Sequence, residues 1–208
     1  MTEMMKTRNK LGFLGILLPV TSVIFNLIFG RNYNPAGVLT SISATYYSSA
    51  FVLFIGLMGA VGLFMWDYRG YDLTDRVTTK IAAISAWMLI LFPCALFNAT
   101  NRNILMVPME ISNIIHLITA FLFFGSLTFI ILFQFPKSAE HVQAGTKKWV
   151  RNIIYRICGI LMIAGLIIGF GGSRIFNFPY LVYIGEWIAL WSFGFAWLTK
   201  GGTFFKDL

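Results

Sequence analysis

Two side chains that can exchange protons, Glu186 and His116, stand inside long apolar stretches of this sequence. Glu186 lies seven residues beyond Pro179, which is about 10 Å along a helix. His116 lies four residues inside another stretch, roughly 6 Å along it. A carboxyl group and an imidazole can work together as acid and base. Because ionisable groups are costly inside apolar segments, each marks a candidate site.

Other polar residues fall at a depth similar to that of Glu186 and His116. At helical spacing Ser112 and Asn113 share a face with His116, and Tyr183 lies one turn before Glu186. The opposite halves of these apolar stretches carry few polar residues, so we expect a pocket that opens at the outer half of a helical bundle. Its expected lining is Glu186, His116, Asn113, Ser112, Tyr183, Asn26, Tyr46 and Tyr47.

These residues allow three interpretations. They can line a ligand or lipid pocket, or form hydrogen bonds between helices, each of which contributes about 0.6 kcal/mol. They can also supply acid–base catalysis by His116 and Glu186, although Ser43 is only a guess for a nucleophile. Two cysteines and two histidines at these positions cannot form a zinc cage, so no metal or other cofactor is expected.

The elements that must position these residues follow from composition. Hydrophobic residues make up 58% of the chain and charged residues 12%, with a mean hydropathy of +0.76. These values exclude an ordinary soluble enzyme. The sequence predicts an all-α polytopic membrane protein with a single domain, 1–208, of six transmembrane helices in one bundle. The expected spans are 11–30, 46–66, 80–98, 112–135, 153–172 and 179–198.

The positive charges predict the orientation. With six spans, thirteen of the sixteen Lys and Arg residues fall on the side of both termini and three on the other. The positive-inside rule therefore places both termini in the cytoplasm. The net charge of +8 then reflects topology rather than nucleic-acid binding. Lys147, Lys148 and Arg151 flank Trp149, so they can hold anionic lipid headgroups or form a solvated loop.

Two local patterns add predictions. Gly165 and Gly169 form a GxxxG spacing, which favours close packing inside the bundle and also allows a homo-oligomer. In the polar loop after the second stretch, Thr74 or Asp75 is expected to cap the third helix.

Several stretches together resemble uncharacterised bacterial multi-span membrane proteins. They are SISATYY from Ser41, WDYRGYD from Trp66, RNIIYRICG from Arg151 and GEWIALWSFGFAWL from Gly185. The six-span layout is also remotely similar to that of the damage-regulated autophagy modulator group. The resemblance implies six helices in a bacterial inner membrane and transfers no catalytic residues.

The leading functional hypothesis is binding or transport of a lipid or small amphiphile, with Glu186 and His116 as polar anchors. One alternative is an intramembrane lipid hydrolase or transferase that uses the same two residues. Another is an oligomeric channel or effector-type membrane protein. Against a channel, no span carries polar residues along its whole length.

Overall fold

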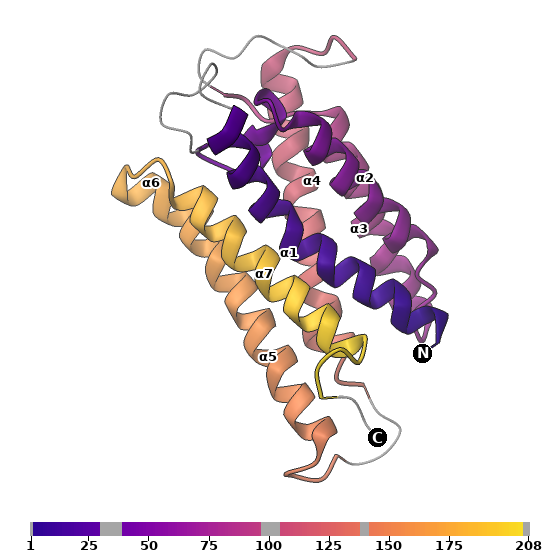
Figure 1. Ribbon diagram of the computed structural model, residues 1–208. Helices are drawn as coiled ribbons and strands as arrows, with labels where there is room; N and C mark the ends of the chain where they lie inside the picture. The colour runs from indigo at the N-terminus through magenta and orange to yellow at the C-terminus, as the bar shows by residue number, and fades with distance from the viewer. Residues whose placement is uncertain (1, 30–38, 97–104, 138–141, 206–208) are drawn as a thin grey trace.

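The computed structural model describes residues 2–29, 39–96, 105–137 and 142–205 of the 208-residue chain. Over these residues the chain is mainly helical and contains no strand, which confirms the all-α prediction. The helices run side by side in one bundle (Figure 1). They are α1 Glu3–Phe29, α2 Phe51–Asp67, α3 Leu73–Leu91, α4 Met109–Phe129, α5 Lys147–Leu166, α6 Ser173–Phe176 and α7 Leu181–Lys200.

Three shorter helical pieces modify this pattern. A 3-10 helix, η2 (Ser43–Tyr47), precedes α2. The π-helical segment η3 (Ile130–Gln134) extends α4, and η4 (Ile167–Gly172) joins α5 to α6. A π-helical turn holds an extra residue, so it changes which residues face the core beyond it.

Four helices are long and apolar enough to cross a membrane: α1, α4 with η3, α5 through α6, and α7. The apolar helix α2 is shorter. Large exposed apolar side chains such as Leu63, Phe121 and Ile160 lie on these helices. In water they would be unfavourable, whereas lipid accepts them. The chain therefore has the helices of a membrane protein, and the six crossings stay a prediction.

Helix bounds differ from the expected spans at several places. Helices α1 and α5 begin earlier than expected, at Glu3 and Lys147 rather than at 11 and 153. Positions 30, 97 and 98 of the expected spans lie outside the described residues. The expected span 46–66 begins with 3-10 turns, so α2 starts only at Phe51. The expected span 80–98 corresponds to α3, which begins at Leu73 and ends at Leu91. The predicted caps, Thr74 and Asp75, are wrong, because the Asp72 carboxylate accepts the Asp75 N–H at 2.9 Å. Asp72 has the extended backbone that an N-cap requires.

Helix α7 lies between α1 and α5 (Figure 1). Glycines permit both close approaches. A Cβ on Gly194 would meet the Gly12 carbonyl oxygen of α1 at 2.7 Å, and a Cβ on Gly185 would strike the Gly165 carbonyl oxygen of α5. The Gly165–Gly169 face thus packs on α7 of the same chain, and a homo-oligomer through those two glycines stays a prediction.

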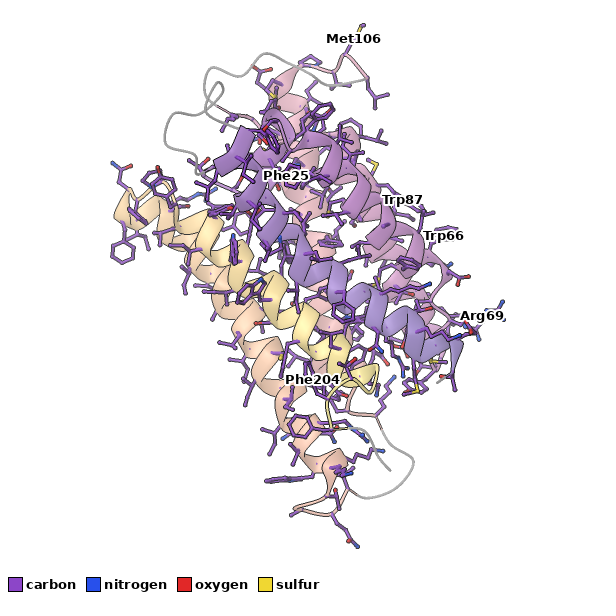
Figure 2. All side chains as sticks on the ribbon, viewed as in Figure 1. Phe25, Trp66, Arg69, Trp87, Met106 and Phe204 are labelled. Atoms are coloured by element: carbon purple, nitrogen blue, oxygen red, sulfur yellow. The ribbon has the colours of Figure 1, made fainter. Side chains whose placement is uncertain are left out.

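The bundle has two distinct ends. We call the end with the start of α1, the end of α7 and the α2–α3 connection the terminal end, and the opposite one the far end (Figure 1). Figure 2 shows Arg69 and Phe204 toward the terminal end and Met106 at the far end. Between them lies an apolar core that includes the fully buried Trp197, Phe123 and Leu127.

Candidate functional site

Glu186 lies near the start of α7, with only 7% of its surface exposed. Its Oε2 accepts a hydrogen bond of 2.5 Å from the backbone N–H of Ile42. The Ser43 side chain is a second partner of the carboxylate. A buried carboxylate needs such donors to replace water. Glu186 therefore connects α7 to the chain that enters η2.

Residues 39–50, which we call the η2 segment, form a buried and largely non-helical stretch. Its serines and threonines bind nearby backbone: Ser41 Oγ accepts the Ala44 N–H at 3.0 Å, and Ser48 Oγ donates to the Thr45 carbonyl at 2.8 Å. Such local bonds compete with helix formation. Thr45 also shares a 2.6 Å hydroxyl hydrogen bond with Ser22 of α1, so the segment is held on two sides.

A small cavity lies beside the η2 segment. Its volume for a water-sized sphere is about 20 Å³, which is enough for one water molecule. Glu186 is the only ionisable residue in its wall. The lining comprises Leu18, Ile42, Ser43, Phe54, Met58, Leu89, Ala120, Phe123, Phe124, Glu186 and Leu190. The cavity therefore combines a single carboxylate with predominantly apolar walls.

His116 has a different neighbour. Its Nδ1 donates to the Phe92 carbonyl oxygen at 2.8 Å, because a carbonyl can only accept. Ser112, one turn earlier on α4, donates to the Pro93 carbonyl at 2.9 Å. Both side chains are buried. They satisfy the backbone just beyond α3, which ends before Pro93 as expected from the restricted conformation ahead of a proline.

Asn113 and Tyr47 contact the same stretch, residues 92–95. Asn113 Oδ1 accepts the Ala95 N–H at 2.8 Å, and the Tyr47 hydroxyl donates to the Cys94 carbonyl at 2.7 Å. Tyr47 also links this stretch to the η2 segment, to which it belongs. Non-helical backbone at membrane depth requires partners of this kind inside the protein.

The remaining candidates have local roles. Asn26 Nδ2 donates to the Ser22 carbonyl at 2.7 Å, one turn earlier on α1. Tyr46 packs edge-on against Tyr47 with ring centroids 5.4 Å apart, and Tyr183 packs against Trp187 at 6.2 Å.

The candidates therefore form two groups. Glu186, with the η2 segment, borders the cavity, whereas His116, Ser112 and Asn113 bind residues 92–95. His116 is not part of the cavity wall. The sequence did not indicate that these side chains would bind backbone groups of two irregular stretches, the η2 segment and residues 92–95. In the sequence, the run of serines from Ser41 to Ser49 was the feature that could have indicated the irregular η2 segment.

The described residues offer little metal or thiol chemistry. Nowhere in the described ranges do three His, Cys, Asp or Glu side chains gather closely enough to hold a metal ion. Cys94 and Cys158 are both free thiols. The chemistry of this site rests on one carboxylate, hydroxyl groups and apolar walls.

Fold and site together define a helical membrane protein with a carboxylate-bearing cavity near the far end of the bundle. No family model, curated protein or solved structure matches the chain. Its function must therefore be inferred from the site itself.

Proposed function

We propose that this protein binds, and in doing so transports or presents, a lipid or small amphiphile in the cavity beside the η2 segment. Glu186 would hold the polar head, and the walls formed by α1, α2, α4 and α7 would surround the apolar part. The observation that carries the proposal is a lone buried carboxylate in an otherwise largely apolar cavity. This mixture of one polar anchor and apolar walls is typical of small-molecule sites.

The cavity must open to admit such a ligand, since its closed volume of about 20 Å³ suits one water molecule. The η2 segment is the element suited to move. It has no long helix of its own, and it is attached to α7 through Glu186 and to α1 through the Thr45–Ser22 hydrogen bond. If the polar head of a ligand took the place of the Ile42 N–H at the Glu186 carboxylate, the η2 segment would lose its attachment to α7.

The proposal includes a topology. Six crossings with both termini in the cytoplasm would place the cavity toward the outer half of a bacterial inner membrane. The thirteen-to-three distribution of Lys and Arg supports this orientation. The resemblance to bacterial six-span membrane proteins implies the same number of crossings.

The enzyme alternative receives less support. Acid–base catalysis by His116 and Glu186 requires both side chains to reach one substrate. They instead bind different backbone carbonyl and N–H groups, and only Glu186 borders the cavity.

Photolabelling tests the binding proposal directly. A long-chain alkylamine with a diazirine on its chain is added to the protein in phosphatidylcholine nanodiscs, and labelled residues are mapped by mass spectrometry. We expect labels on cavity-wall residues such as Leu18, Phe124 and Leu190. Glu186→Gln should reduce this labelling roughly tenfold, the factor that corresponds to about 1.4 kcal/mol.

Two variants of α4 provide the controls. Ala120→Leu adds bulk to the cavity wall and should abolish labelling there, whereas Phe121→Leu alters a side chain that is 75% exposed and should not. Labels confined to exposed residues such as Phe121 and Ile160 in every variant would refute the proposal.

A further inference from the structure

The terminal end of the bundle contains two cations that the cavity does not involve. The first is Arg8 of α1, which is only 5% exposed. Its Nε and Nη2 donate to the Tyr68 hydroxyl at 3.0 and 2.9 Å, and Nη2 also contacts the Met4 sulfur. None of these partners carries a full negative charge at neutral pH. The guanidinium is thus buried with its charge unbalanced.

The second cation is Lys200, the last residue of α7. Its Nζ donates to the Phe135 carbonyl at 2.6 Å and lies 5.3 Å from the Phe135 ring centroid and 5.6 Å from that of Tyr155. These contacts provide a dipole and aromatic faces, which attract a cation without neutralising it.

One ring joins the two cations. The Tyr71 centroid lies 5.2 Å from Arg8 Cζ and 5.1 Å from Lys200 Nζ. Tyr71 is 56% exposed, so it covers the pair from the solvent side. It follows Gly70, whose positive φ of 58° turns the chain sharply at this point. The Tyr71 ring therefore contacts both cations at a place where it also meets solvent.

Negative charge is scarce around this pair. In the described part of the chain the ion pairs are Lys6–Glu3 and Lys137–Asp72, and neither includes Arg8 or Lys200. Asp75 attracts Lys200, yet its Oδ2 already accepts the Tyr71 N–H at 2.7 Å. Arg8, Lys148 and Arg151 all repel Lys200. Like charges gathered in a partly buried site are unfavourable unless an anion offsets them.

Two buried uncharged polar groups next to the rings around these cations lack a hydrogen-bond partner in the described part of the chain. Trp197 packs on Tyr68 and Phe135, the rings beside the two cations, and its buried Nε1 has no hydrogen-bond acceptor. Gln134, which precedes Phe135, is 2% exposed and its Oε1 also lacks a partner. Buried polar groups rarely remain unpaired. A ligand with acceptor oxygens could pair the Trp197 N–H, whereas Gln134 Oε1 is itself an acceptor and needs a separate donor.

We propose that Arg8 and Lys200 form a binding site for a phosphate group at the terminal end of the bundle, with Tyr71 as its cover. Arginine and lysine are the usual phosphate ligands, the first through paired donors and the second as a point charge. The phosphate can belong to a lipid headgroup in the adjacent leaflet or to a soluble phosphate. This site differs from the sequence-predicted headgroup contact at Lys147, Lys148 and Arg151, because it includes the buried Arg8, whereas those three side chains are exposed or partly exposed.

Thermal unfolding in nanodiscs distinguishes the two sources. The protein is placed in phosphatidylcholine discs, in discs that also contain phosphatidic acid, and in phosphatidylcholine discs with inorganic phosphate at constant ionic strength. A ligand that binds only the folded state raises the unfolding midpoint. We expect an increase of several degrees with phosphatidic acid. A saturable increase with inorganic phosphate identifies a soluble ligand as well, and its absence restricts the site to lipid.

Lys200→Met and Lys10→Met each remove one positive charge near the same end, but Lys10 is exposed on α1. We expect Lys10→Met to keep the increase, Lys200→Met to lose it, and Lys200→Arg to restore it. An equal response of Lys10→Met and Lys200→Met, or no response of the wild type to either phosphate source, would overturn the proposal.

Discussion

At the scale of single residues, Glu186 supplies the hydrogen-bond acceptor that the Ile42 N–H does not find in the backbone. The carboxylate accepts the Ile42 N–H at 2.5 Å inside the protein, where water cannot compete. The same residue is thus a support for the η2 segment and the proposed anchor for a ligand. These roles are compatible, because a group that binds a backbone N–H in one state can bind a ligand donor in another.

Glu186→Ala is expected to destabilise the protein by about 1–3 kcal/mol, since the buried Ile42 N–H would lose its acceptor. Glu186→Gln keeps an acceptor oxygen at the same place and should cost less. The measurement is the unfolding midpoint followed by tryptophan fluorescence in mild detergent. Equal losses for the two variants would contradict the assigned hydrogen bond, since Gln keeps both an acceptor oxygen and nearly the volume of Glu.

The sequence predicted where these polar side chains lie better than it predicted what they contact. Depth along a helix placed Glu186 and His116 at one end of the bundle, as the structure shows. Their partners are the backbone of Ile42 and Phe92, in stretches that are not regular helix. Every residue carries an N–H or a carbonyl, so residue types alone do not indicate which of them lacks a helical partner.

At the scale of elements, the position of α7 between α1 and α5 depends on glycines that let backbones meet. A side chain at Gly185 would strike the Gly165 carbonyl oxygen and come within 2.9 Å of the Gly169 N. These atoms belong to the backbone and cannot rotate away. Any residue larger than glycine therefore pushes α7 and α5 apart, and with α7 it displaces Glu186.

Gly185→Ala should lower stability by about 1–3 kcal/mol, the usual cost of overpacking. The matched control is Gly125→Ala on α4, where an added Cβ would meet nothing within 4 Å. That control should be neutral or stabilising by up to about 1 kcal/mol through helix propensity. Both are compared by unfolding midpoint in the same detergent. A Gly185→Ala protein as stable as Gly125→Ala would show that the α5–α7 contact is looser than described.

The start of α3 gives a prediction on pH. The Lys137 ammonium, followed by the Asp75 N–H, lowers the pKa of the Asp72 carboxyl below its usual value of 3.8. A lowered folded-state pKa means that Asp72 stabilises the protein above its unfolded pKa and loses this effect as pH falls through the folded pKa. Asp72→Asn retains a capping oxygen but no charge. Its stability relative to the wild type should therefore improve as pH falls from about 5 to about 3.

Unfolding midpoints of both proteins across that pH range provide the measurement. A constant difference between them would exclude a contribution from the Lys137–Asp72 ion pair, which joins α3 to the chain beyond η3 at 2.6 Å.

Element bounds were less predictable than the existence of the elements. Hydropathy favoured a third span at 80–98, whereas α3 covers Leu73–Leu91. Its first turns are polar, so an apolar window misses them, and Pro93 ends it before the apolar run is exhausted. The 3-10 turns of η2 were hidden for a similar reason, because the run of Tyr46 and Tyr47 has the composition of a helix that starts at a membrane interface.

At the scale of the whole molecule, the two ends of the bundle differ in chemistry. The far end holds Glu186 and hydroxyl groups around a small cavity, while the terminal end holds the buried Arg8 and the partly buried Lys200. A carboxylate at one end and cations at the other suit a protein that lies across a membrane in one orientation. On the proposed topology, the positive-inside rule predicts that the cationic end faces the cytoplasm.

Cysteine accessibility tests this orientation. In a variant without Cys94 and Cys158, single cysteines are placed at Glu3 and Gln143 near the terminal end and at Met106 at the far end, all of them exposed. In intact bacterial cells with a permeabilised outer membrane, an impermeant maleimide should label only the cysteine at Met106. The other two should react only after the inner membrane is opened, because an even number of crossings keeps them on the cytoplasmic side. Labelling of Glu3→Cys but not Gln143→Cys in intact cells would mean an odd number of crossings between them. Labelling of both without Met106→Cys would reverse the orientation, and the Glu186 cavity would then face the cytoplasm.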